Sequence, residues 1–511
     1  MKERIKKFNY KKLILPLIVI LSEVFLYFQM MDLQPKLTAK YQWMFLAVCI
    51  CANIACLVIL WLLKKFDKMK IQTVFLTIAG IYGGLYMVFV PALLGTDELP
   101  HFLRPYQISV GDVIVKHPEK NETMIPKNIG EFVGEDKLAD RYTDKYLLHE
   151  SSYDDTVNLW NGDVTSIDYS PIPYLPQVIG FWIARLFHLS PLFTMYMVRF
   201  CNFMTWLGLG YLAFKILPVK KIFALILYTS PAVLSLVSTC SGDAFALGLF
   251  FVFIAYILQF IYNKREVKKK DIVLLTLISL GFSTYKVFYV PYVLFLFLIP
   301  KSCFKDSLKR KVGTILPIIF GAFLLDFLWF MASAVGQVSS GLVSEQIEYI
   351  LMNPLKYVFT FVNTYVTALE YFIPNITAGT EMCYGLVRIN QILIYGYCAF
   401  FFASYFFDNK KSKVTKSGKW LVILVCLAIF GLVSTTLYLG WTSSKLGVGS
   451  SSIIGIQSRY FWPLLIPLVC ILPNCKKKLK NEKKFVQYAV VLNAVIMINT
   501  ISSLLIAVFP K

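Results

Sequence analysis

Charged residues are scarce in this chain of 511 residues, and no long polar stretch is present that could form an ordinary soluble domain. Asp, Glu, Lys and Arg make up 16% of the sequence, whereas about 25% is typical of globular domains. Hydrophobic residues make up 57% and occur in long uninterrupted runs. A run of about 20 apolar residues crosses a bilayer as a helix, and a membrane β-barrel would show short alternating segments instead. The sequence therefore predicts an all-α membrane protein.

Nucleotide-binding signatures are also absent from the sequence. It contains no G-x-x-x-x-G-K-[ST] motif and no G-x-G-x-x-G after a strand-like segment. The net charge of +21 would indicate nucleic-acid binding in a soluble protein, but here the lysines gather in short loops between apolar runs. The positive-inside rule assigns such loops to the cytoplasm. We therefore expect the lipid bilayer, and not nucleic acid, as the partner of these charges.

The apolar runs predict about thirteen transmembrane helices. The predicted spans are 12–31, 42–63, 72–94, 191–214, 222–240, 243–263, 271–285, 288–300, 312–335, 389–407, 419–440, 459–474 and 485–509. The pair at 271–285 and 288–300 is too short for two full crossings, so tilted or partial helices are expected there. With thirteen crossings all Lys-rich loops fall on one side, which places the N-terminus in the cytoplasm and the C-terminus outside. Segment 171–188 then lies on the outer surface as an interfacial helix.

The span count divides the chain into three parts. These are two additional N-terminal spans in 1–71, a membrane core in 72–475, and a cytoplasmic basic loop with a final span in 476–511. The outer loops of the core are expected at 95–190, 336–388 and 441–458. Residues 95–170 contain fifteen of the thirty acidic residues, and we expect the outer loops to form a helical cap over a membrane-level cavity.

The first outer loop opens with the octet Asp97-Glu98-Leu99-Pro100-His101-Phe102-Leu103-Arg104. Asp97, His101 and Arg104 have the spacing i, i+4, i+7, which places them on one face of a helix that Thr96 is expected to cap. An acceptor, a titratable ring and a fixed cation would then meet a substrate together. The alternative interpretation is that Asp97 and Glu98 only cap the helix and that Arg104 extends to lipid headgroups.

Three further positions carry charge near the predicted outer face. Asp243 begins a helix after Ser241-Gly242, Lys286 lies between two apolar runs, and Arg459 begins a late span just after Gln457. Each has a structural alternative, which is a helix cap for Asp243 and contact with lipid headgroups for the two cations. Asp97, Glu98 and His101 are also weak candidate ligands for Mg²⁺ or Mn²⁺, the one cofactor that the residues suggest.

The stretch Asp97-Glu98-x-x-His101-Phe102-x-Arg104 resembles the signature of a bacterial family of multispanning membrane proteins of unknown function. Three further pieces match in order: Ser170-Pro171 with Tyr174-Leu175-Pro176, then Ser241-Gly242-Asp243-Ala244, and Gln457-Ser458-Arg459-Tyr460-Phe461. That family is similar to the GT-C superfamily, membrane glycosyltransferases that take sugar from a polyprenyl-phosphate carrier. The chain departs from the pattern by two extra spans, by Gly242 where Pro is usual, and by Pro105 after Arg104.

The resemblance implies a GT-C-like fold and an inverting glycosyltransferase of the cell envelope that serves polysaccharide biosynthesis. The donor would be a polyprenyl-phosphate-linked sugar, and the acceptor a cell-surface glycan or glycolipid at the outer face. The expected catalytic residues are Asp97, Glu98 and Asp243, and the expected substrate-binding residues are His101, Arg104, Lys286, Gln457 and Arg459. One alternative is a lipid-linked-glycan flippase or exporter. Internal repeats would favour that interpretation, and the sequence has none. A second alternative is a surface-polysaccharide polymerase.

Overall fold

A computed structural model describes most of the chain. The described residues are 24, 39–114, 123–158, 169–333, 340–378, 382–385, 387, 389–407, 411–473 and 481–508. Within them the protein is almost entirely helical, and the one sheet is an antiparallel pair of three-residue strands, β1 (Met124–Pro126) and β2 (Thr156–Asn158). The prediction of an all-α protein is confirmed.

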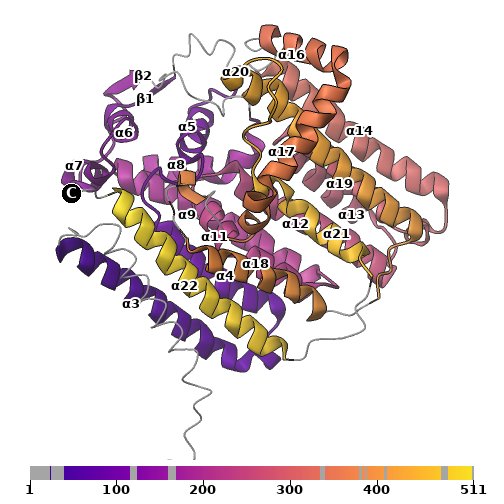
Figure 1. Cartoon of the computed structure of the whole chain (residues 1–511), viewed down its shortest axis with the longest axis horizontal. Coiled ribbons are helices and arrows are strands. Elements are labelled where there is room, and N and C mark those ends of the chain that lie inside the picture. The colour runs from indigo at the N-terminus through magenta and orange to yellow at the C-terminus, as the bar shows by residue number, and fades with distance from the viewer. Residues whose placement is uncertain are drawn as a thin grey trace, which may run out of the picture.

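Among the described residues, six helices are long and apolar enough to cross a membrane. They are α3 (Ala39–Leu62), α4 (Ile71–Phe89), α12 (Gly242–Asn263), α14 (Leu308–Ala332), α19 (Lys416–Leu437) and α22 (Glu482–Val508). In Figure 1 these helices share a similar direction. They confirm a polytopic membrane protein, whereas the count of thirteen spans and the GT-C-like fold stay predictions, and the predicted span 12–31 lies outside the described residues except for Val24.

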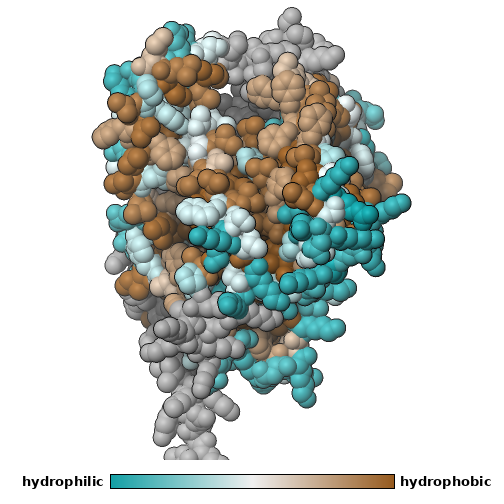
Figure 2. Space-filling view, turned by 90° about the vertical axis from the view of Figure 1, so that its right-hand side faces the viewer, coloured by the Kyte–Doolittle hydropathy of each residue, from teal (hydrophilic) through white to brown (hydrophobic). Residues whose placement is uncertain are grey.

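The centre of the bundle is formed by α9 (Pro191–Ile216), which packs against α4, α12 and α8 (Leu175–Leu186). Most residues of α12 are buried, whereas α14 at the periphery leaves large apolar side chains exposed. The face of the molecule that carries α14 and α19 is accordingly largely hydrophobic (Figure 2). In a membrane protein such a surface is expected to face lipid, because lipid takes the place of water as the solvent.

The predicted span 222–240 is wrong as a single helix, because the structure divides it into α10 (Lys221–Tyr228) and α11 (Pro231–Val237). Pro231 has no N–H to continue the helix and disfavours the helical conformation for the residue before it. Ser230 is accordingly extended, with φ −68° and ψ 151°. The break turns the chain toward the end of the bundle where α12 begins.

Two short helices occupy the predicted pair of tilted or partial spans. They are α13 (Lys269–Ser283), with 15 residues, and the 3₁₀ helix η6 (Val287–Leu298), with 12 residues. Lys286 immediately precedes η6 in an extended conformation, with φ −142° and ψ 125°. The interruption places this lysine at a helix junction, where its side chain is not committed to a regular helix face.

Small elements cover the end of the bundle that carries the octet. They are α5 (Glu98–Ser109), α6 (Lys127–Val133), η4 (Leu138–Tyr142), α7 (Asp144–Leu147) and η5 (Ile172–Tyr174), together with α8 and the β1–β2 pair. A separate apolar core holds them together, formed around Phe102, Phe132, Tyr146 and Phe181. The 12-residue helix α8 occupies most of the predicted interfacial segment 171–188.

The remaining elements complete the chain between and after the long helices. They are η2 (Leu63–Lys68), η7 (Lys301–Phe304), α16 (Ser340–Met352), α17 (Pro354–Asn375), η8 (Met382–Gly385), α18 (Gln391–Ala403), η9 (Ser404–Phe407), the π-helical turn η10 (Tyr438–Thr442), α20 (Ser443–Leu446), η11 (Ser458–Phe461) and α21 (Trp462–Ile471). In Figure 1, α17 runs across the direction of the long helices, beside α19.

Candidate functional site

Asp97 lies at the turn between α4 and α5, immediately before the first helical residue of α5. Its backbone is left-handed, with φ 55° and ψ 23°, a conformation that Asp adopts more readily than most residues. Asp97, and not the expected Thr96, is therefore the N-cap residue, and its side chain makes no capping hydrogen bond in the structure. The carboxylate is 37% exposed and remains available for other contacts.

Glu98, the next residue, occupies a different environment. Its side chain is fully buried and forms an ion pair with Arg199 of α9, with two N···O distances of 2.6 Å. The backbone N–H groups of Gly95 and Cys240 donate to the same carboxylate at 2.9 Å. Because these bonds occupy both oxygens, we do not retain Glu98 as a catalytic residue.

Arg199 also binds the end of α4, and this explains why the pair holds the octet in place. Its guanidinium donates to the carbonyl oxygens of Met87, Val90 and Pro91 at 2.7–3.0 Å. Buried charges are tolerated only when they are paired and fully hydrogen-bonded, and Arg199 meets both conditions. The Glu98–Arg199 pair therefore fixes α4, α5 and the chain before α12 relative to one another.

The same face of α9 positions Asp243. The side-chain amide of Asn202 donates to the carbonyl oxygens of Thr239 and Ser241, at 2.9 and 3.1 Å. Ser241 is the N-cap of α12, and its hydroxyl accepts from the backbone N–H of Asp243 at 3.1 Å. Asp243 thus lies in the first turn of α12, where the helix dipole stabilises a carboxylate. Its own side chain is not the cap.

Gly242 allows a close approach at this helix start. A Cβ added to Gly242 would lie 2.7 Å from the ring of Tyr285, which is itself buried. A proline here, which the resemblance to the related family led us to expect, would introduce that atom. Glycine at position 242, which has no Cβ, therefore allows Tyr285 to pack against the first turn of α12.

Lys286 meets Asp243 from the junction of α13 and η6. Its ammonium nitrogen lies 3.1 Å from Oδ1 of Asp243. The rings of Tyr285 and Tyr460 lie 4.6 and 4.7 Å from the same nitrogen, within cation–π range. The lysine is buried, so its charge is held by one carboxylate and by aromatic faces instead of by water.

Arg459 of η11 joins the two aspartates. Its guanidinium forms an ion pair with Asp97, and its Nε lies 3.3 Å from Oδ2 of Asp243. The structure thus brings together four of the predicted site residues from four separate elements: Asp97, Asp243, Lys286 and Arg459, hereafter the charge cluster. Apart from Asp97, their side chains are less than 10% exposed.

Two buried atoms of the charge cluster lack a hydrogen-bond partner in the structure. Nε of Arg459 and Oδ2 of Asp243 are close enough for an ion pair, but their geometry does not make a hydrogen bond. The amide oxygen of Gln457 and the hydroxyl of Tyr285 are also buried without a partner. Buried polar groups in folded proteins are nearly always satisfied, by protein or by water. The charge cluster therefore contains one donor and one acceptor that are not used in hydrogen bonds.

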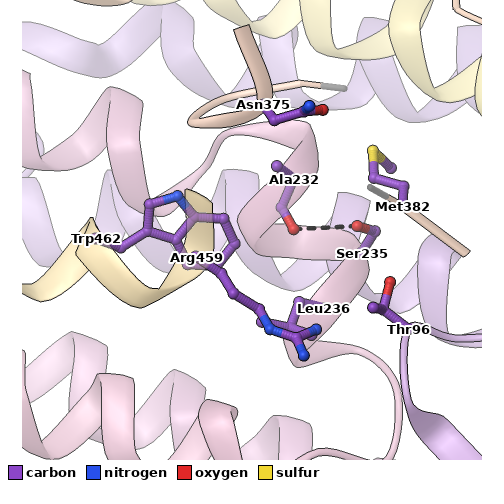
Figure 3. Close-up of a pocket in the computed structure, with 8 residues that line it drawn as sticks. All are labelled: Thr96, Ala232, Ser235, Leu236, Asn375, Met382, Arg459 and Trp462. Carbon is purple, nitrogen blue, oxygen red and sulfur yellow. Dashed lines mark hydrogen bonds between the residues drawn. The ribbon is translucent and has the colours of Figure 1, made fainter. Parts of the chain in front are cut away.

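A small pocket opens beside Arg459 (Figure 3). It is lined by Thr96, Ala232, Ser235, Leu236, Asn375, Met382, Arg459 and Trp462. The guanidinium of Arg459 extends past Leu236 of α11, and Asn375 at the end of α17 lies above Ala232 in this view. The cavity volume is about 20 Å³, roughly the room that one water molecule needs.

His101 lies beside the charge cluster, on the side of the small elements that cover this end of the bundle. Its Nδ1 lies 2.5 Å from the hydroxyl of Tyr174, and its ring stacks on Tyr169 and Tyr174. Burial lowers the pKa of His101 to about 4, against the opposing effect of the carboxylates of Asp243 and Asp97. The ring is therefore neutral at pH 7.

The pKa of Asp97 reflects two opposing influences. Burial acts to raise it, but Arg459, His101 and Lys286 together outweigh burial, with Arg459 the strongest of the three, and hold the pKa below the usual value for Asp. Asp97 is therefore a carboxylate at neutral pH. As the most exposed member of the charge cluster, it is also the group that an incoming molecule would meet first.

Arg104 does not join the charge cluster. Its guanidinium is fully buried and donates to the backbone carbonyls of Tyr169 and Val113, at 2.7–3.2 Å. Arg104 and His101 both contact Tyr169, as residues on one face of α5 can, but the guanidinium is bound to backbone carbonyls instead of joining the charge cluster. The side chain joins the chain around Tyr169 to α5, which makes Arg104 a positioning residue.

The weak metal site predicted from Asp97, Glu98 and His101 does not fit the donor set. Glu98 already uses both carboxylate oxygens, His101 is bound to Tyr174, and Asp97 is paired with Arg459. Among the described residues, no group of three or more His, Cys, Asp or Glu side chains could hold a metal ion. Two fixed cations beside the aspartates also disfavour a divalent ion by charge repulsion.

The sequence reasoning missed the aromatic part of the site. Tyr169, Tyr174, Tyr285 and Tyr460 surround His101 and Lys286. A signal was present in the sequence, because Tyr285 directly precedes Lys286 and Tyr460 directly follows Arg459.

The long apolar helices and the buried charge cluster at one end of the bundle define a multi-pass helical membrane protein. A family model described as a predicted membrane protein family, DUF2142, matches residues 81–469, which is more than half of the chain. The protein belongs to this family. Neither the curated proteins nor the solved structures contain a match to the chain.

Proposed function

We propose that the protein transfers a sugar from a polyprenyl-phosphate carrier to a cell-surface glycan or glycolipid, on the outer face of the membrane. The observation that carries this proposal is the charge cluster, in which two aspartates and two cations from four elements meet at one end of a membrane bundle. Two acids and two cations fit a reaction that removes a proton from one reactant and stabilises a departing phosphate on the other.

Asp97 is the proposed general base. The acceptor hydroxyl gives its proton to the carboxylate of Asp97 while its oxygen bonds to the anomeric carbon of the sugar. The bond between that carbon and the phosphate oxygen breaks, and the electron pair leaves with the polyprenyl phosphate. Such a direct displacement inverts the configuration of the anomeric carbon. Asp97 suits this role because it is the more exposed aspartate of the charge cluster.

Lys286 and Arg459 are the proposed phosphate-binding residues. Each retains capacity to donate, since Lys286 makes one ion pair and Nε of Arg459 has no hydrogen-bond partner. Negative charge grows on the phosphate oxygens as the bond breaks, and a fixed cation at a water-poor site stabilises that charge more strongly than in water. Asp243 contacts both cations and would hold them in position.

The two halves of the mechanism are linked through Arg459. In the structure its guanidinium pairs with Asp97 and keeps the pKa of that carboxylate low. A phosphate that draws Arg459 away would remove this cation and raise the basicity of Asp97. The donor would therefore activate the base on binding, and the acceptor would be deprotonated only when a donor is present.

The test uses the purified protein in liposomes with a glycan acceptor and either a polyprenyl-phosphate sugar or the matching nucleotide sugar. We expect sugar transfer from the lipid-linked donor and none from the nucleotide sugar. The double variant Lys286→Ala, Arg459→Ala should lose transfer, and Lys145→Ala, at an exposed lysine of α7, should retain it. Transfer from the nucleotide sugar alone would overturn the proposal. Movement of an intact lipid-linked glycan across the bilayer, without any new glycosidic bond, would instead identify a flippase.

A further inference from the structure

The helix α17 has an unusual distribution of side chains on its surface. Threonines 360 and 364 are 5–6% exposed, and Thr364 accepts a hydrogen bond from the backbone N–H of Ile453. On the outside, large apolar side chains are 38–83% exposed. They are Leu355, Val358, Phe359, Val362, Val366, Leu369 and Ile373. A helix that faces water shows the opposite pattern, with apolar residues inside and polar residues outside.

The exposed apolar residues form one continuous stripe along α17. Their separations of three, four or one residue keep them within a sector of about 100° on a helix with 3.6 residues per turn. Beside the stripe runs a second exposed strip, which is polar and contains Lys356, Thr367 and Glu370. The surface of α17 therefore has three sectors, one against the protein, one apolar and exposed, and one polar and exposed.

The protein-facing sector of α17 packs on the membrane bundle. The hydroxyl groups of Tyr357 and Tyr365 hydrogen-bond to Thr435 and Ser434 of α19, at 2.7 and 2.8 Å. The ring of Tyr365 also stacks on Phe430 of α19, at a centroid distance of 4.2 Å. Since α19 is long and apolar enough to cross a membrane, α17 lies directly on a membrane-spanning helix.

Exposed apolar side chains are also present on other long helices, including α19, on which α17 packs. On α19, Leu424 and Leu427 are 60–61% exposed, and α14 exposes Phe320 and Phe327 to a similar degree. Figure 2 shows that much of the face that carries α14 and α19 is hydrophobic, with hydrophilic residues gathered toward its lower right. Within the described residues, no other element covers the stripe. Lipid surrounds the exposed apolar surface of a membrane protein, so lipid is the expected partner of the stripe.

We infer that α17 is an in-plane interfacial helix, whose apolar stripe inserts among the hydrocarbon chains of membrane lipids and whose polar strip faces water. Helices with one apolar and one charged face adopt this position at the boundary of a bilayer. The direction of α17 across the long helices agrees with it (Figure 1). This placement differs from the expected water-facing loop at 336–388, and it holds whether or not the protein transfers sugars.

The placement also sets the depth of the charge cluster. The C-terminal end of α17 is tied to η11 and α21, because Ser458 donates to the carbonyl of Phe372 and Trp462 donates to that of Ile376. Asn375 lines the pocket beside Arg459. If α17 lies at the level where lipid headgroups meet hydrocarbon, then Arg459 lies at nearly the same level, where lipid phosphates are found.

The test attaches a nitroxide to single introduced cysteines in the purified protein, reconstituted in liposomes. Collisions with oxygen report lipid, and collisions with a water-soluble nickel chelate report water. The matched pair is Val366→Cys and Thr367→Cys, which are adjacent on α17 and belong to the stripe and to the polar strip. Leu148→Cys is the apolar control, because Leu148 is exposed by the same 68% as Val366 but lies next to α7, among the small outer elements. The unsubstituted protein gives the background from native cysteines.

We expect oxygen access at Val366 and nickel access at Thr367 and Leu148. Nickel access at both α17 positions would mean a water-facing loop, and oxygen access with nickel exclusion at both would mean a fully inserted helix. Exclusion of both reagents at Val366 would mean that protein covers the stripe. Each of these three results would overturn the inference.

Discussion

Two buried ion networks lie side by side at the same end of this protein, and they differ in how completely their hydrogen bonds are made. The Glu98–Arg199 pair is fully enclosed, and backbone groups at the end of α4, in the turn before α5 and in the chain before α12 complete its bonds. The charge cluster instead contains buried atoms of Arg459 and Asp243 without partners, and one of its aspartates reaches the surface.

The difference separates residues that hold the fold from residues that are free to change partner. A complete network resists change, because any lost bond leaves a buried charge unpaired. An incomplete network already bears that cost and gains bonds when a charged molecule arrives. Asp97 and Glu98 are neighbours in the sequence, yet they belong to different networks. We therefore expect substitutions in the two networks to have separable effects on turnover and stability.

Apart from the change of Asp97 itself, the largest effect is expected from Lys286→Gln in the charge cluster. Removing one preorganised donor from a developing oxyanion commonly costs 10²- to 10³-fold in rate, and we expect a loss of about that size in sugar transfer. Transfer assays in liposomes, normalised to folded protein, measure it. Lys145→Gln is the matched control, since Lys145 lies on the surface and pairs only with Glu131. Equal turnover in both variants would remove Lys286 from the proposed mechanism.

The complete network is tested by Glu98→Gln. This change leaves the charge of Arg199 buried and unpaired, which typically costs about 3–5 kcal/mol of folding free energy. Unfolding by heat or denaturant in detergent measures the loss. The double variant Glu98→Leu, Arg199→Met should recover part of it, because no charge then remains, although Gly95 and Cys240 still lose an acceptor. The single variants Glu98→Leu and Arg199→Met are measured beside it. A loss of stability in the double variant equal to the sum of these two losses would contradict a structural ion pair.

The close contact at the start of α12 predicts a smaller effect for Gly242→Ala. The added Cβ would lie 2.7 Å from the ring of Tyr285, and overpacking of this kind costs about 1–3 kcal/mol. Gly84→Ala in α4 is the control, because a Cβ there meets nothing within 4 Å, and alanine favours a helix by about 1 kcal/mol. Thermal unfolding should therefore shift in opposite directions for the two variants. A neutral result at Gly242 would mean that Tyr285 moves freely.

The smallest effect concerns pH and His101. Its pKa is about 4 in the folded protein, below the ordinary value of about 6.5 that the unfolded chain retains. Between these values the unfolded state binds more protons, so stability falls as pH falls, by about 1 kcal/mol from pH 6.5 to 5.5. His101→Phe should remove this part of the slope, whereas His149→Phe, at an exposed position, should not. Identical slopes in all three proteins would contradict a buried neutral His101.

Much of the fold followed from the sequence because hydrophobic length is a strong signal. The long runs predicted the helices that became α3, α4, α12, α14, α19 and α22. The break between α10 and α11 was missed although Pro231 marks it, because mean hydropathy does not register a single proline. The inside-out pattern of α17 was also missed, since a run mixed with Lys, Thr and Glu resembles an outer loop until its exposed face is known.

The candidate site was predictable in its residues but not in its connections. Asp97, Asp243, Lys286 and Arg459 were expected as separate charges near one face, and their direct contacts depend on four distant elements. Asp97 lies partly exposed in the charge cluster, whereas Glu98 is buried against Arg199. This difference depends on the left-handed backbone at Asp97 and on the position of Arg199 a hundred residues away. Neither is visible in a local pattern.

The most direct test compares the two adjacent acids in one experiment. Asp97→Asn, Glu98→Gln and the exposed control Asp136→Asn are placed in the same liposomes, and sugar transfer from a polyprenyl-phosphate sugar is measured per folded molecule. General-base catalysis contributes about 10²- to 10⁴-fold. We predict a loss of that size for Asp97→Asn at nearly unchanged stability, and wild-type transfer per folded molecule for Glu98→Gln and Asp136→Asn. Normal transfer by Asp97→Asn, or an equal loss in folded Glu98→Gln, would contradict the division between the two networks.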